Sequence, residues 1–164
     1  MYLSLENLNL LILVLASLTA LTMVVIKKRW LNRQLVTDQG ILLVSSHIRT
    51  ATLSFIKRQY STAGKVIFLI FLLLLFLAYK GFLTYYTPFA VLSGAFFSAL
   101  SAYLGMLAAV KANAITAYAT KLGINKAFKA ALNGGAVMGF SVCGFDLLDL
   151  AFWYGLIKFM NPEM

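Results

Sequence analysis

The sequence predicts an all-α fold, a polytopic membrane helical bundle with four transmembrane helices and both termini outside. Of its 164 residues, 62% are hydrophobic and only 12% are charged, whereas ordinary soluble domains have about 25% charged residues. The uncharged residues form long stretches, and about 20 apolar residues in a helix cross the hydrocarbon core of a bilayer. We expect a single membrane domain, residues 1–164, with spans at about 7–27, 63–82, 87–112 and 130–157.

The first two expected spans are joined by a polar connector, residues 31–62. The first span ends at a basic cluster, Lys27–Arg29, which is typical of a membrane interface. In the connector, apolar residues alternate with basic ones, and this pattern predicts either a helix on the membrane surface or a cytoplasmic extension of the second span. His47 lies there without a second His, Cys or carboxylate nearby. We therefore expect a solvated or interfacial histidine rather than a metal ligand.

Small residues mark the third and fourth spans. Two rows at four-residue spacing run along the third span, over residues 94–102 and 101–109, and a GxxxG pair lies in the fourth. Lipid tails are as apolar as leucine, so membrane helices associate where small residues let their backbones approach closely. The predicted helix-packing positions are small residues in this pattern: Gly94, Ser98, Gly105, Gly135 and Gly139.

The basic residues are distributed unevenly between the connectors. Twelve of the fourteen Lys and Arg residues lie in or at the edges of the first connector and of the third, which runs from Lys111 to Lys129, and only Lys80 and Lys158 fall on the other side. Cytoplasmic loops carry an excess of basic residues, so both connectors are predicted to be cytoplasmic and both termini external. This distribution accounts for the net charge of +9 without nucleic acid as a partner.

Two segments resemble a known family. The segment GAFFSALSAYLGMLAAVKANAITAYA, followed by NGGAVMGFSVCGF, is similar to the third and fourth transmembrane helices of the membrane-bound inorganic pyrophosphatases, which are ion pumps. The resemblance extends over about residues 48–150 and departs from the family pattern at Ala102, usually Gly, and Ile115, usually Arg. The matching positions are Gly94, Ala95, Ser98, Tyr103, Gly105, Met106, Ala112, Asn113, Thr116, Ala117, Gly134, Gly135, Val137, Met138 and Gly139.

The resemblance implies that this chain is the N-terminal part of such a pump and supplies its outer scaffold helices. The whole pump would hydrolyse pyrophosphate with magnesium and export sodium or protons, and the choice of ion stays open. Its implied partners are the lipid bilayer, the remaining helices of the pump and a second copy in a homodimer. The implied location is the inner membrane of a bacterial cell.

Catalytic carboxylates are missing from the sequence. It has five acidic residues, of which only Asp38 lies in a predicted cytoplasmic connector, and a magnesium–diphosphate cluster needs several carboxylates. We therefore assign no catalytic residue and no metal ligand, and expect residues 1–164 alone to be inactive. A second hypothesis is a free-standing four-helix subunit with a structural or assembly role. A third is an ion-carrying subunit.

Asp146 and Asp149 are the two acidic residues inside an expected span. They lie three residues apart, which places them on the same side of a helix. Carboxylates within a bilayer are costly and mark pathways, cavities or partners. The pair predicts either an intramembrane ion pathway or contacts with another helix, and the family mostly has Gly at both positions.

Overall fold

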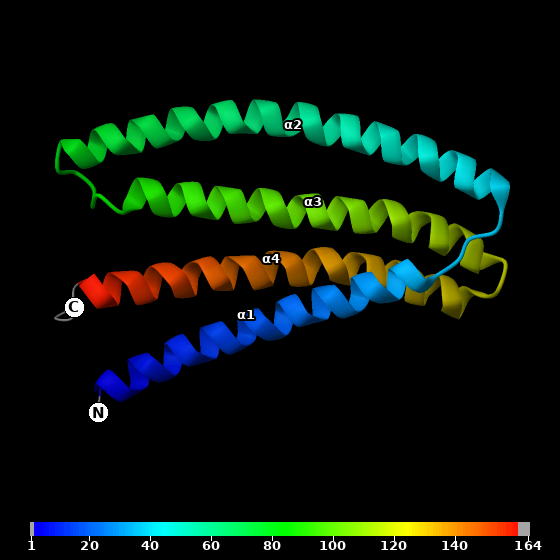
Figure 1. Cartoon of the computed structure of the whole chain (residues 1–164), viewed down its shortest axis with the longest axis horizontal. Coiled ribbons are helices and arrows are strands. Elements are labelled where there is room, and N and C mark those ends of the chain that lie inside the picture. The colour runs from blue at the N-terminus through cyan, green and yellow to red at the C-terminus, as the bar shows by residue number, and fades with distance from the viewer. Residues whose placement is uncertain (1, 161–164) are drawn as a thin grey trace.

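The protein is an array of four long antiparallel helices, seen in a computed structural model that describes residues 2–160, with side chains from residue 7 (Figure 1). Each helix is long and apolar enough to cross a membrane. The described residues contain no strand, so the prediction of an all-α fold with four membrane-spanning helices is confirmed. The helices are α1 (Tyr2–Arg33), α2 (Gln39–Tyr79), α3 (Thr87–Thr120) and α4 (Ile124–Met160).

The helices lie side by side in the order α2, α3, α4, α1 (Figure 1). Contacts are most extensive between α3 and α4 and between α1 and α4, whereas α1 and α2 do not contact each other. Both ends of the chain lie at the same end of the array. Because the array is mostly one helix thick, only 6–22% of the residues in the most apolar window of each helix are buried. Most of the apolar surface therefore faces outward.

The helices are longer than the spans expected from hydropathy. The amphipathic part of the 31–62 connector belongs to α2, a single helix of 41 residues, so of the two alternatives it is an extension of the second span. At 1.5 Å per residue α2 is about 62 Å long, roughly twice the thickness of the hydrocarbon core. The third connector is likewise helical apart from residues 121–123. Hydropathy marks where a helix leaves lipid, but backbone hydrogen bonding continues beyond that point.

Specific residues end the helices. Asp38 caps α2, because its side chain accepts a hydrogen bond from the Ile41 amide at 3.1 Å. Pro88 lies in the first turn of α3, where its missing N–H has no intrahelical partner to lose. Gly81 and Gly123 adopt φ angles of 80° and 119°, which other residues rarely adopt. These two glycines let the chain reverse between α2 and α3 and between α3 and α4.

Small residues bring α3 and α4 together. A Cβ atom added to Gly134 would lie 2.3 Å from Ala112 Cβ, and one added to Gly105 would lie 2.6 Å from Met138 Cγ. Buried positions on both helices alternate at spacings of three and four residues, which keeps them on one side of a helix. On α3 they are Ser101, Gly105, Ala108, Ala112, Ile115 and Ala119, and on α4 they are Ala127, Ala130, Gly134, Val137 and Ser141. We call these eleven residues the α3–α4 seam.

The predicted packing positions are placed unequally. Gly105 lies in the seam, Gly94 is only in ordinary contact with Asp149, and Ser98 is exposed. Gly135 and Gly139 were expected to pack against another helix. In the described part of the chain both are exposed, and a Cβ on either would meet nothing within 4 Å. A strict four-residue spacing rotates by about 40° per step around a helix with 3.6 residues per turn. Packing of these two glycines stays a prediction for helices outside this chain.

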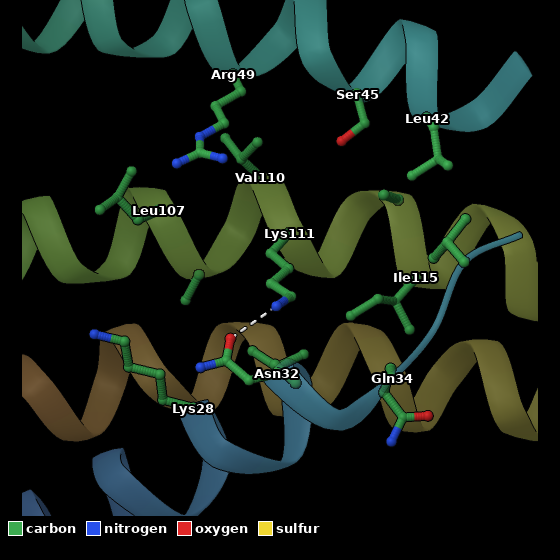
Figure 2. Close-up of a pocket in the computed structure, with 14 residues that line it drawn as sticks. Lys28, Asn32, Gln34, Leu42, Ser45, Arg49, Leu107, Val110, Lys111 and Ile115 are labelled. Atoms are coloured by element: carbon green, nitrogen blue, oxygen red, sulfur yellow. Dashed lines mark hydrogen bonds between the residues drawn. The ribbon is translucent and has the colours of Figure 1, made fainter. Parts of the chain in front are cut away.

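Polar contacts fix the outer two helices of the array. The buried Ser17 hydroxyl of α1 donates to the Gly144 carbonyl oxygen of α4 at 2.9 Å. The Tyr60 hydroxyl of α2 donates to the Ala99 carbonyl oxygen of α3 at 2.6 Å. At the end of the array away from the termini, Lys111 of α3 donates to Asn32 Oδ1 of α1 at 2.8 Å (Figure 2). Each outer helix is therefore tied to the central pair.

We predict that Gly134→Ala destabilises the protein by about 1–3 kcal/mol, because its new methyl group overlaps Ala112 and the overlap exceeds the gain in helix propensity. Gly135→Ala is the matched control, since the neighbouring glycine has no atom within 4 Å of the new Cβ. The thermal midpoint of each variant in detergent, measured on the intact protein, tests this. Equal midpoints for the two variants would contradict the seam described above.

Candidate functional site

Asp149 lies between α3 and α4, in the half of the array near the termini. Its Oδ2 atom would be 3.4 Å from a Cβ on Gly94, and its Oδ1 atom is buried without a hydrogen-bond donor among the described residues. Asp146, three residues earlier on α4, is exposed. The two acids that the sequence placed together therefore differ in environment: Asp149 faces α3, and Asp146 faces away from the described helices.

The surroundings of Asp149 are aromatic and hydroxylic. One turn earlier on α4, the ring of Phe145 stacks on Phe97 with their centroids 5.7 Å apart. One turn later, Trp153 Nε1 donates to Ser93 Oγ at 2.7 Å. These two contacts lie one turn on either side of the carboxyl group, between α3 and α4. A buried polar atom without a partner costs about 1–3 kcal/mol, so the site favours a hydrogen-bond donor for the carboxyl oxygen.

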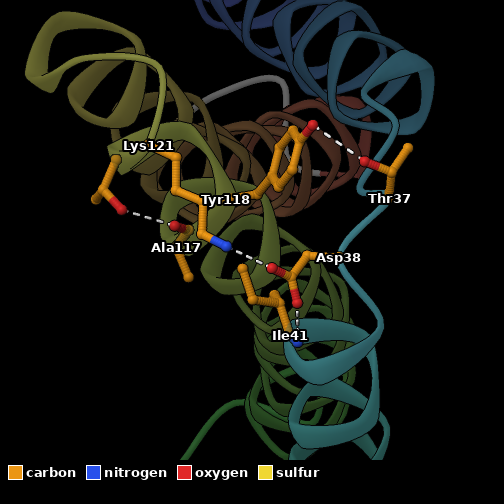
Figure 3. Close-up of polar contacts among 7 residues, drawn as sticks. Thr37, Asp38, Ile41, Ala117, Tyr118 and Lys121 are labelled. Carbon is orange, nitrogen blue, oxygen red and sulfur yellow. Dashed lines mark hydrogen bonds and ion pairs between the residues drawn. The ribbon is translucent and has the colours of Figure 1, made fainter.

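A second polar cluster joins the two connectors at the opposite end (Figure 3). Lys121, directly after α3, forms an ion pair with Asp38 Oδ2 at 2.5 Å. Next to it, the Thr37 hydroxyl donates to the Tyr118 hydroxyl at 3.0 Å. The hydrogen bond from Lys121, followed by that from the Ile41 amide, lowers the pKa of Asp38, and the same pair raises the pKa of Lys121. The cluster fixes the start of α2 against the end of α3.

The described residues do not gather metal ligands. No three His, Cys, Asp or Glu side chains among residues 7–160 come close enough to hold a metal ion. Asp38, the one acid in a connector, is engaged by Lys121 and by the cap of α2, and His47 is exposed. What the described part of the chain brings together is a carboxyl group, that of Asp149, between two helices.

The comparisons with known proteins decide the family. The family described as "Inorganic H+ pyrophosphatase" matches residues 18–163 of this chain. The chain belongs to this family. No solved structure matches it.

Relatives in this pyrophosphatase family include both sodium and proton pumps. The chain is 40% identical over 113 residues to the K⁺-stimulated pyrophosphate-energized sodium pump of Thermotoga maritima, covering 68% of the chain and 15% of that pump. It is 36% identical over 140 residues to the K⁺-insensitive pyrophosphate-energized proton pump of Methanosarcina mazei, covering 85% of the chain and 20% of that pump. A third relative is K⁺-insensitive pyrophosphate-energized proton pump 2 of Moorella thermoacetica. The two are 36% identical over 120 residues, which cover 73% of the chain and 17% of that pump.

This pyrophosphatase-family chain spans about a fifth or less of the length of the curated relatives it matches. Together with the four membrane-spanning helices, the match shows an integral, multi-pass membrane protein. The resemblance found in the sequence is therefore confirmed.

Sequence reasoning did not find the hydrogen bond between Trp153 and Ser93 or the unequal placement of the two acids. Trp153 lies towards the far end of the fourth expected span, and a partly buried indole N–H needs an acceptor. Phe145, Asp149 and Trp153 follow each other at four-residue spacing and so lie in one row along α4. Asp146 lies outside this row, and this difference could have indicated that only Asp149 faces the same neighbour as the two aromatic residues.

We predict that the Ile41 amide exchanges hydrogen faster in Asp38→Ala than in Asp38→Asn. Asn still caps the helix but loses the charge attracted to Lys121, whereas Ala loses both. Hydrogen exchange measured at Ile41 in the intact protein tests this, with Ser46→Ala as a control that removes only a local exposed hydrogen bond.

The ion pair also predicts a pH dependence. Because the folded pKa of Asp38 is lowered, its contribution is present above about pH 4 and is lost as the pH falls through that folded pKa. The raised pKa of Lys121 keeps its contribution until the pH exceeds about 10.5. Acid should therefore move the exchange of the wild-type protein, corrected for intrinsic rates, towards that of Asp38→Asn. An unchanged rate down to pH 2 would contradict the pairing.

Proposed function

We propose that this chain supplies outer scaffold helices of a pyrophosphate-energised pump that couples pyrophosphate hydrolysis to export of sodium ions or protons. The observation that supports this most directly is the family match over residues 18–163 on a chain whose described residues gather no metal ligands. The relatives that are named pyrophosphate-energized pumps are five or more times longer than the aligned part. The catalytic carboxylates of the assembly then lie outside residues 7–160.

The shape of the array supports a scaffold role. A layer that buries only 6–22% of each apolar window leaves two broad apolar faces uncovered. Lipid suits one such face, and further membrane helices suit the other, because small exposed residues such as Gly135 and Gly139 permit close backbone approach. The remaining helices of the pump are the proposed occupants of that second face, with a second copy completing a homodimer.

The proposed assembly also implies a substrate, a cofactor and an orientation. Pyrophosphate would be bound through magnesium ions held by carboxylates outside this chain. The two basic connectors support a cytoplasmic location for the α1–α2 and α3–α4 turns and an external location for both termini. The bacterial inner membrane is the proposed location.

A free-standing subunit with a structural or assembly role is the second candidate. The observation in its favour is the α3–α4 seam, together with the buried hydrogen bond from Ser17 to Gly144, because these contacts hold α1, α3 and α4 together without further chains. In this case the catalytic helices would be a separate polypeptide that copurifies with the chain.

Measurement of phosphate release tests the proposed function. We expect residues 1–164, purified alone, to hydrolyse no pyrophosphate with magnesium present, because the described residues gather no ligands for the metal cluster. The intact assembly in vesicles should hydrolyse pyrophosphate and take up sodium ions or protons. Hydrolysis by residues 1–164 alone would refute the scaffold role, and an intact assembly without hydrolysis would refute the pump.

We predict that the double variant Asp146→Asn, Asp149→Asn keeps both hydrolysis and ion uptake within about twofold. Asn preserves the size and hydrogen bonding of the side chain and removes only the titratable proton, so a contact between helices survives while an ion pathway does not. Asp149→Leu is the comparison variant that removes the polar contact as well. Hydrolysis retained with uptake lost in the double Asn variant would place the ion pathway on α4.

A further inference from the structure

A basic pocket lies between α1, α2 and α3, at the end of the array away from the termini. Lys28 of α1, Arg49 of α2 and Lys111 of α3 border the same space (Figure 2). The cavity has a volume of about 490 Å³. None of these side chains contributes to the seam, to the Asp149 site or to the Asp38 cluster.

The positive charges of this pocket are not neutralised within the described chain. No acidic residue lines the cavity, and the only ion pair among residues 7–160 joins Lys121 and Asp38. Lys111 donates a hydrogen bond to Asn32 Oδ1, but Asn32 carries no charge that could neutralise it. Three cations that border one cavity raise its potential, and an anion bound among them would lower their mutual repulsion.

The pocket lies where two charge-free stretches end. α1 carries no charge from Asn7 to Ile26, and Lys28 comes two residues later. The chain carries none from Gly81 to Val110, and Lys111 follows directly. Stretches of this length fill the hydrocarbon core, so the residues just beyond them lie at the level of the lipid headgroups.

The floor of the pocket is apolar and continues along α3. Leu100, Leu104, Leu107 and Lys111 follow each other at spacings of four, three and four residues, which places them on one side of the helix. Leu107 lines the pocket, and Leu100 and Leu104 are half-buried. Because α1 and α2 do not contact each other, they leave space over this side of α3. A cationic end and an apolar row together suit an amphiphile.

We propose that this pocket binds the phosphoryl headgroup of an anionic phospholipid, with an acyl chain along the leucine row of α3. Arg49 can hold two phosphate oxygens through the planar fork of its guanidinium group, and Lys28 and Lys111 add point charges. Basic pockets between transmembrane helices on the cytoplasmic side are suited to such headgroups. A free phosphate or pyrophosphate ion shares the headgroup chemistry but makes no use of the leucine row.

Native mass spectrometry of the intact protein with phosphatidylglycerol tests the proposal. We expect one retained phosphatidylglycerol per copy of this chain, and no comparable retention of phosphatidylcholine. Each basic residue near an anionic lipid contributes roughly a fivefold factor in affinity. The triple variant Lys28→Gln, Arg49→Gln, Lys111→Gln should therefore bind phosphatidylglycerol about 100-fold more weakly.

The matched control removes the same number of charges elsewhere. Arg33, Lys57 and Arg58 are exposed and do not line the pocket, and their triple replacement by Gln should leave the retained lipid within about threefold of wild type. Equal loss in the two triple variants would overturn the proposal in favour of general surface attraction. Displacement of the lipid by millimolar inorganic phosphate or pyrophosphate would also overturn it, because the site would then prefer a free anion.

Single variants keep the proposal testable if the triple variant folds poorly. Arg49→Gln should weaken phosphatidylglycerol binding about fivefold, and Arg49→Lys should fall between it and wild type because Lys keeps the charge without the fork. Leu104→Asn makes the leucine row polar without changing the charge, and it should weaken phosphatidylglycerol binding by several-fold. Inorganic phosphate should still not displace the lipid from this variant. Unchanged binding in Arg49→Gln and Leu104→Asn would refute the pocket as the lipid site.

Discussion

The close approach of α3 and α4 is the constraint on which the array depends. Apolar side chains gain little by leaving lipid for another helix, so membrane helices must associate through close packing. A side chain on Gly134 would overlap Ala112, and one on Gly105 would overlap Met138, so both positions need glycine for the helices to approach this closely. α4 then packs against α1 through Gly144, where an added Cβ would lie 2.8 Å from Leu21. One helix with small residues towards two neighbours therefore organises the whole chain.

This arrangement determines what the chain leaves uncovered. A central pair with one further helix packed on each side gives a layer, and a layer buries few of the apolar side chains it carries. The contacts of α2 illustrate this, because α2 meets only α3. A closed bundle would hide such surfaces, whereas a layer leaves them exposed on both faces. This exposure is the property on which the proposed scaffold role depends.

The sequence determined the kind of fold but not the contact faces. Long uncharged stretches were enough to predict four spans, and the departures lie at helix ends, where hydropathy falls but hydrogen bonding continues, as in α2 from Gln39. To predict whether Gly134 or Gly135 packs against α3, one must know how α4 is rotated about its own axis. A GxxxG pair does not specify that rotation. Gly134 faces Ala112 at the closest approach, while Gly135 faces open space. For the candidate site, the sequence was enough to single out Asp146 and Asp149. Which of the two is buried depends on the rotation of α4 about its axis.

Charge then separates the two ends of the array by physical role. The end near the termini holds an acid, Asp149, between two helices, and the buried Oδ1 atom calls for a hydrogen-bond donor. The other end holds the basic pocket and the exposed Asp38–Lys121 pair, where water and headgroups stabilise charge. Most basic residues of the array lie at the connector end, and moving them through hydrocarbon is costly, which favours one orientation of the layer in the membrane. A layer held in this way resists inversion and displacement in depth, as the proposed scaffold role requires.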